Sequence, residues 1–139
     1  MKFKFLEDIA TADVAFEAYG SSLEEAFSNA ALAMFEVQTE VEKIKPSNSK
    51  NVEIVSESKE SLLFDWLSEL LFLRDTSAMF FGKFDIKIEQ NKQYKLTGKV
   101  YGERIEGHEL RTEVKAVSYQ MMNIEESEGS VKIRVILDV

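Results

Sequence analysis

The stretch SKESLLFDWLSELLFLRD, residues 58–75, decides the fold class. Its large apolar side chains recur at intervals of three, four, seven and eight residues, at Leu62, Leu63, Trp66, Leu67, Leu70 and Leu71. This spacing predicts an α-helix with one wide buried stripe. Ser58 can cap the helix at its start, and we expect the helix to end near Arg74 or Asp75.

A second helix is predicted upstream, over residues 21–37. Two serines that open this segment are each followed three residues later by a glutamate, which is a capping-box signature in two possible registers. Its apolar face repeats at helical spacing, at Phe27, Ala30, Ala31, Met34 and Phe35. The preceding residues 13–19, DVAFEAY, alternate in part and stop at Gly20, so we predict a strand and a turn there.

The rest of the chain alternates between strand and turn patterns. We predict a loop at 39–50, strands at 51–57, 79–89 (with an interruption at Gly82), 94–101, 113–122 and 131–137, turns at 91–93 and 125–130, and a polar connection at 102–111. The order β-α-β-α followed by hairpin strands is an α+β pattern. We expect two helices packed on one face of a largely antiparallel (mixed) β-sheet.

The length, composition and charge of the chain exclude several classes of function. The 139 residues suit one domain, 1–139, and the chain has no cysteine, which excludes disulfides, cysteine-based zinc sites and a thiol nucleophile. With 17 basic and 25 acidic residues, the net charge of −8 disfavours stable binding to nucleic acid and favours a cation or a basic protein surface. No signal peptide or membrane-spanning run is visible, so we expect a cytoplasmic protein without a membrane partner.

Common catalytic motifs are missing. The single histidine, His108, lies in a polar connection, where we expect a solvated surface residue rather than a member of a catalytic triad. The six glycines form neither GxGxxG nor GxxxxGK[ST], so a phosphate-cradling loop is not predicted. No basic patch with interleaved aromatic residues points to an RNA-binding surface.

Carboxylates at the ends of predicted strands are the candidates for chemistry. Asp8 and Asp13 flank the first strand, and Asp138 precedes Val139 at the end of the last strand. If those strands are neighbours, Asp13 and Asp138 converge, and their oxygens suit a hard divalent cation. An aspartate at a strand end is, however, also a common turn residue. Lys115, in EVKAVSY, usually would point to solvent, but if turned inward it could pair with the carboxylates or contact a phosphate.

Several segments together resemble the archease family, in the order in which the family has them. They are TAD (11–13), AYG (18–20), SLEEAF (22–27), AALAMF (30–35), LLFDWLSELL (62–71), EVKAVSY (113–119) and VILDV (135–139). They extend over nearly the whole chain. The resemblance implies a small α+β protein that acts with an RtcB-type RNA ligase in tRNA splicing and tRNA processing.

The resemblance also implies a mechanism and a site. Archeases promote guanylylation of the ligase, which uses GTP and a metal, and so allow multiple turnovers. The family binds a divalent cation, typically calcium with Mg²⁺ or Mn²⁺ as alternatives. The matching residues here are Asp13 and Asp138, with Val139 as a further oxygen donor and Lys115 as a functional residue. Three positions depart from the family: Ala10 and Gln120 lie where many archeases have histidine, and Ser118 replaces threonine.

Three functions are compatible with the sequence. The first is a metal-binding activator of an RNA ligase that is not itself an enzyme. The second is a chaperone-like protein-interaction module without a dedicated ligase partner. The third is a metal-dependent hydrolase built on Asp13, Lys115 and Asp138, which we rank last because such chemistry needs more converging ligands.

Overall fold

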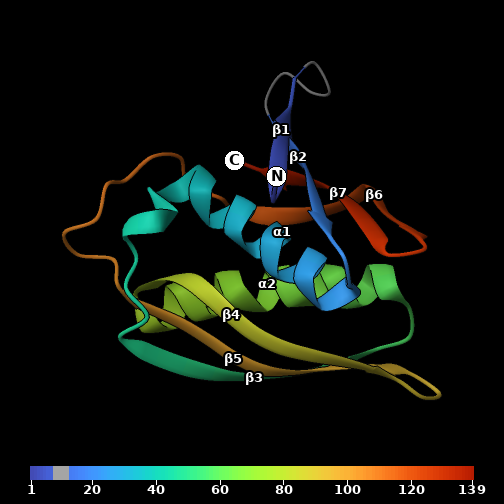
Figure 1. Cartoon of the computed structure of the whole chain (residues 1–139). Coiled ribbons are helices and arrows are strands. Elements are labelled where there is room, and N and C mark those ends of the chain that lie inside the picture. Colours follow the sequence, from blue (N-terminus) through green and yellow to red (C-terminus); the bar gives the residue numbers. More distant parts are fainter. Residues whose placement is uncertain (8–12) are drawn as a thin grey trace.

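A computed structural model describes residues 1–7 and 13–139 of the chain (Figure 1). Its elements, in chain order, are β1 (Phe3–Leu6), β2 (Asp13–Gly20), α1 (Leu23–Gln38), a short 3₁₀ helix η1 (Val41–Lys43), β3 (Asn48–Ser56), α2 (Lys59–Ser77), β4 (Met79–Gln90), β5 (Tyr94–Arg104), β6 (Ala116–Ser127) and β7 (Ser130–Asp138). The α+β class is confirmed.

The strands form two separate sheets, not the single sheet expected from the sequence. Within the described residues, one sheet has four strands in the order β1-β2-β7-β6, the other has three in the order β3-β5-β4, and all their pairs are antiparallel. Both helices lie between the sheets, as Figure 1 shows. The expectation of helices on one face of one sheet was therefore wrong, because strand periodicity identifies buried faces but not the pairing partners.

Burial on several sides explains why the helices need two sheets. The helix α1 contacts β2 and β7 of the four-stranded sheet and β4 of the three-stranded sheet. Its buried positions surround most of the helix: Ala26, Phe27, Asn29, Ala30, Ala31, Ala33, Met34, Phe35 and Gln38. The helix α2 contacts β6 on one side and β3, β4 and β5 on the other. A helix that is apolar on more than one face is buried by more than one layer.

The predicted helix starts are confirmed in detail. Ser22 caps α1, because its Oγ accepts a hydrogen bond from the Glu25 amide at 3.1 Å. The carboxylate of Glu25 reaches back to the Ser21 amide at 2.9 Å, so the Ser22–Glu25 register is the one used. Ser58 caps α2 through Ser61, and α2 continues to Ser77, slightly beyond the expected end. A Cβ on Gly20 would lie 2.5 Å from the Ala26 nitrogen, so only glycine permits this close β2–α1 junction.

Strand boundaries were predicted less well. The edge strand β1 was not predicted, β3 begins inside the expected 39–50 loop, and η1 occupies the same loop. The turn expected at 125–130 is reduced to residues 128–129, because β6 and β7 both extend further. These extensions consist mainly of exposed polar residues, which carry no buried alternation to announce a strand. The expected interruption at Gly82 is confirmed as a register shift between Phe81 and Lys83.

No helix in residues 1–7 and 13–139 has the length and apolar character needed to cross a membrane.

Candidate functional site

The pairing of β2 with β7 brings the two ends of the chain together. Asp13, the first residue of β2, is the direct cross-strand partner of Asp138, the last residue of β7. Directly opposed residues of an antiparallel pair point to the same face, with Cβ atoms roughly 4.5–5.5 Å apart. This face is the outer one, turned away from the helices, because the alternate residues Phe16 and Ala18 belong to the core.

Lys115 joins this pair through its backbone. The neighbouring residue Ala116 opens β6 and pairs with Asp138 from the other side of β7. The Lys115 amide donates a hydrogen bond to the Asp138 carbonyl oxygen at 2.8 Å. The Lys115 side chain is exposed, and the ion pairs found among the described residues do not include it. Lys115 lies immediately before β6, so the prediction that it lies inside a strand was wrong.

The donor set has the right chemistry for a hard cation but is small. Asp13 and Asp138 are both exposed and offer carboxylate oxygens, the ligands that Ca²⁺ and Mg²⁺ prefer. In the part of the chain that the structure describes, no group of three or more His, Cys, Asp or Glu side chains could hold a metal ion together. The pair fits a cation that keeps water or takes further oxygens, as Mg²⁺ usually does.

The other predicted site residues have different outcomes. Val139 follows β7 directly and is half-buried, and its role as an oxygen donor stays a prediction. Asp8 and Ala10 lie outside the described residues. Gln120 is exposed and lies where the β6–β7 register is interrupted, between Ser118 and Asn123.

The sequence matches a known protein family over almost its whole length. Residues 3–139 match the model of the Archease protein family. The chain belongs to the archease family. Protein archease of Methanothermobacter thermautotrophicus is 52% identical over 139 residues, which are 99% of this chain and 98% of that protein. Protein archease of Sulfolobus acidocaldarius is 41% identical over 140 residues, with 99% of each protein covered.

Solved archease-like structures agree with the fold. The solution structure of Methanobacterium thermoautotrophicum protein 1598 matches with a TM-score of 0.87 and 51% identity, over 99% of both chains. A crystal structure described as an archease, possible chaperone, from Thermotoga maritima matches with a TM-score of 0.64, over 94% of this chain and 93% of that chain. At 23% identity, the second match supports the fold alone.

This archease chain carries an ionic cluster on the same outer face, which the sequence did not single out. Glu17 pairs across β2–β7 with Arg134, whose Nη2 lies 3.1 Å from a carboxylate oxygen, and the Tyr19 hydroxyl donates to the same carboxylate at 3.0 Å. The ammonium nitrogen of Lys132 lies 3.9 Å from a carboxylate oxygen of Glu17. Burial by itself would raise the pKa of Glu17, but the hydrogen bonds from Arg134 and Tyr19 and the charge of Lys132 outweigh it and lower that pKa.

The histidine of this archease chain is not the solvated residue that we expected. The His108 side chain is only 11% exposed, and its Nε2 lies 2.7 Å from a carboxylate oxygen of Glu103. Its ring also meets Phe80 edge-on at 6.3 Å between ring centroids. The sequence could not show this, because both contacts depend on how the connection after β5 folds back. His108 thus stabilises the connection and lies apart from the Asp13–Asp138 pair.

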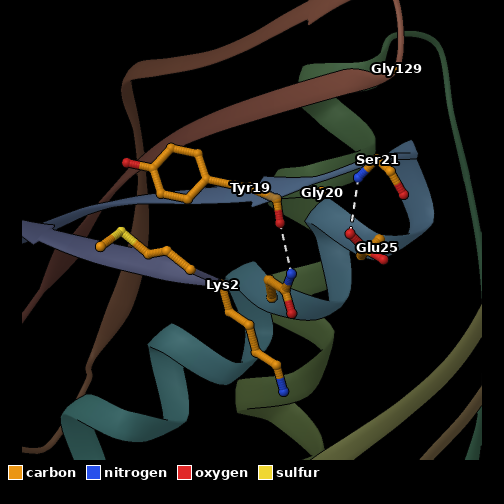
Figure 2. Close-up of a pocket in the computed structure, with 8 residues that line it drawn as sticks. Lys2, Tyr19, Gly20, Ser21, Glu25 and Gly129 are labelled. Carbon is orange, nitrogen blue, oxygen red and sulfur yellow. Dashed lines mark hydrogen bonds between the residues drawn. The ribbon is translucent and has the colours of Figure 1, made fainter.

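A pocket of about 530 Å³ lies at the other end of β2 (Figure 2). The Asn29 side chain donates to the Tyr19 carbonyl at 2.7 Å, and the Ser21 amide donates to the Glu25 carboxylate at 2.9 Å. Figure 2 shows the bond between Ser21 and Glu25. These bonds hold the β2–α1 junction, and the lining residues of the pocket include none of the predicted site residues. Since β2 advances about 3.3 Å per residue, the pocket is remote from Asp13.

Proposed function

We propose that this protein is an accessory factor that activates an RtcB-type tRNA-splicing RNA ligase. In this proposal it promotes guanylylation of the ligase, in which a ligase histidine takes GMP from GTP and pyrophosphate leaves, and it thereby supports multiple turnover. The observation that carries the proposal is the direct opposition of Asp13 and Asp138, with the Lys115 amide bonded to Asp138. Membership of the archease family supports the same role.

Each residue receives a task that suits its chemistry. Asp13 and Asp138 would hold a divalent cation, which is Ca²⁺ by the family resemblance with Mg²⁺ or Mn²⁺ as alternatives, and Val139 would add an oxygen. The cation would offset the repulsion of the opposed carboxylates and present positive charge toward a phosphate or a ligase carboxylate. The exposed Lys115 ammonium would contact a nucleotide phosphate or a ligase carboxylate beside that cation.

The charge of the chain supports a protein partner over a nucleic acid. A net charge of −8 repels phosphate backbones, so we expect the ligase, and not the RNA, to be the stable binding partner. The protein itself would perform no ligation. We expect the complex to act in the cytoplasm.

Guanylylation of the cognate ligase tests the proposal. The ligase is incubated with GTP and metal, with and without this protein, and the rate of covalent guanylate transfer is measured. Asp13→Ala, Lys115→Ala and Asp138→Ala are compared with Asp85→Ala, which removes an exposed aspartate from β4. The wild type and Asp85→Ala should both accelerate transfer, and the three site variants should not. Equal acceleration by all variants would reject the site.

A chaperone-like interaction module is the second candidate. It is favoured by large apolar side chains at the surface, with Phe72 60% and Leu110 71% exposed. Single exposed apolar residues are also normal on monomers, so this observation is the weaker one. Suppression of aggregation of an unrelated client protein, undiminished in Asp13→Ala, would favour this role.

A further inference from the structure

The peptide unit between Val114 and Lys115 is held at both of its polar ends. Its carbonyl oxygen, on Val114, accepts a hydrogen bond from Nη1 of Arg74 at 2.8 Å. Its N–H, on Lys115, donates to the carbonyl oxygen of Asp138 at 2.8 Å. Because a peptide unit is planar, these two bonds fix its orientation between α2 and β7. This unit leads directly to the Lys115 Cα.

The surrounding segment has no regular structure before β6, and its Val114 side chain is buried in the core. Residues 109–115 belong to no helix or strand. Its other backbone anchors lie earlier, where the amides of Arg111 and Thr112 donate to the carbonyls of Gln38 and Val37 at 2.9 and 3.1 Å. Among the hydrogen bonds of the described residues, the Arg74 side chain alone ties the last part of this segment to a helix.

The Arg74 side chain, which makes this contact, lies in the interior of the protein. It lies in the last turns of α2, where an arginine would be expected to extend into water, but it is only 7% exposed. Its Nη1 also donates to the Gln38 side-chain oxygen at 2.6 Å, and its Nε donates to Asp75 at 2.8 Å. A buried guanidinium is costly to desolvate unless its donors are satisfied. The fork of one guanidinium thus joins α1, α2 and the segment before Lys115.

We propose that Arg74 is a positioning residue that places Lys115 beside Asp138. The functional consequence rests on the proposed ligase-activating role of Lys115. The Asp13–Asp138 pair is fixed by β2–β7 pairing and does not depend on Arg74, so the two parts of the site have separate supports. Loss of Arg74 should therefore release Lys115 and leave the carboxylate pair in place.

Arg74→Met tests this placement, because methionine fills part of the volume without the hydrogen bonds. The matched control is Asn29→Ala, which removes another buried side chain with a hydrogen bond to a backbone carbonyl, that of Tyr19 at 2.7 Å. Amide hydrogen exchange is measured residue by residue in the folded proteins. We expect the Lys115 amide to exchange at least tenfold faster in Arg74→Met, relative to the core amide of Leu96, and to be unaffected in Asn29→Ala. An unchanged Lys115 amide in Arg74→Met would overturn the proposal.

Calcium binding separates positioning of Lys115 from general damage to the site. Arg74→Met and Lys115→Ala are compared in the guanylylation assay, and each is titrated with Ca²⁺ by calorimetry. We expect Arg74→Met to lower activation several-fold, Lys115→Ala to abolish it, and both variants to change Ca²⁺ affinity by less than twofold. A Ca²⁺ affinity that falls in Arg74→Met as far as activation does would show that Arg74 supports the carboxylate pair and does not act through Lys115. If the wild type itself does not activate the ligase, the proposed function fails, and hydrogen exchange still decides the placement.

Discussion

Asp13 and Asp138 lie directly opposite each other in the β2–β7 pair, although they come from opposite ends of the chain. Like charges directly opposite each other destabilise a strand pair. A bound divalent cation would reverse the sign of that interaction. The pair is thus a point where stability should respond to metal.

Calcium should raise the thermal stability of the wild type through this pair. A ligand that binds only the folded state at a hundredfold excess over its Kd stabilises by about 2.7 kcal/mol. Asp13→Asn and Asp138→Asn should lose the calcium-dependent rise in Tm, and without metal should melt at or above the wild-type Tm. Scanning calorimetry with and without calcium measures this. A calcium response that survives in both variants would place the cation elsewhere, and Asp85→Asn serves as the exposed control.

Glu17 should make the protein sensitive to acid. Its folded-state pKa is lowered below the usual 4.5 by Arg134 and Tyr19, in spite of its burial. Its contribution is therefore present above pH 4.5 and is lost as the pH falls through the folded-state pKa. Glu17→Gln should unfold about 1 kcal/mol more easily at pH 7, with a difference that shrinks below pH 4.5. Urea unfolding across this pH range measures it.

The control for Glu17 is Glu125, which is 58% exposed, lies 3.3 Å from the Lys132 ammonium and accepts a hydrogen bond from Asn123 at 3.2 Å. Glu125→Gln should change the free energy of unfolding by less than about 0.5 kcal/mol at any of these pH values. A Glu125→Gln effect as large as that of Glu17→Gln would mean that general surface charge, and not the Arg134–Tyr19 contacts, sets the acid response.

Trp66 should be the most costly single truncation in α2. It is fully buried, and its indole Nε1 donates to the Phe27 carbonyl of α1 at 3.0 Å. Trp66→Ala should lower the free energy of unfolding by about 3–5 kcal/mol. The urea titration should be followed by circular dichroism and not by tryptophan fluorescence, because Trp66 is the only tryptophan and the variant lacks it. Phe72→Ala, on the exposed side of α2, should cost far less, and similar costs for both would contradict the described burial.

The helices could be predicted because their evidence is local. The leucine and tryptophan spacing of α2 and the Ser22 and Ser58 caps are readable within a few residues. The division into two sheets could not be predicted, since it depends on which strands pair, and that is decided between distant segments. The edge strand β1 was missed although its sequence FKFL alternates, because four residues are a weak signal.

The candidate site was predictable in part. Asp13 and Asp138 were expected to converge if the last strand lay beside the first predicted strand, and the β2–β7 register places them opposite each other. The roles of Arg74 and His108 could not be inferred. Both side chains would ordinarily face water, and their burial depends on contacts between distant segments, as in the bonds of Arg74 to Gln38 and to the Val114 carbonyl.

Multiple-turnover RNA ligation shows whether this protein activates the ligase through Asp13, Lys115 and Asp138. The number of ligation products formed per molecule of the cognate RtcB-type ligase is measured with GTP and metal, with this protein in its wild-type form or as folded Asp13→Ala, Lys115→Ala and Asp138→Ala. We expect many products per ligase molecule with the wild type and about one with each variant. A competent ligase whose product number is unchanged by the wild-type protein would contradict the proposed role.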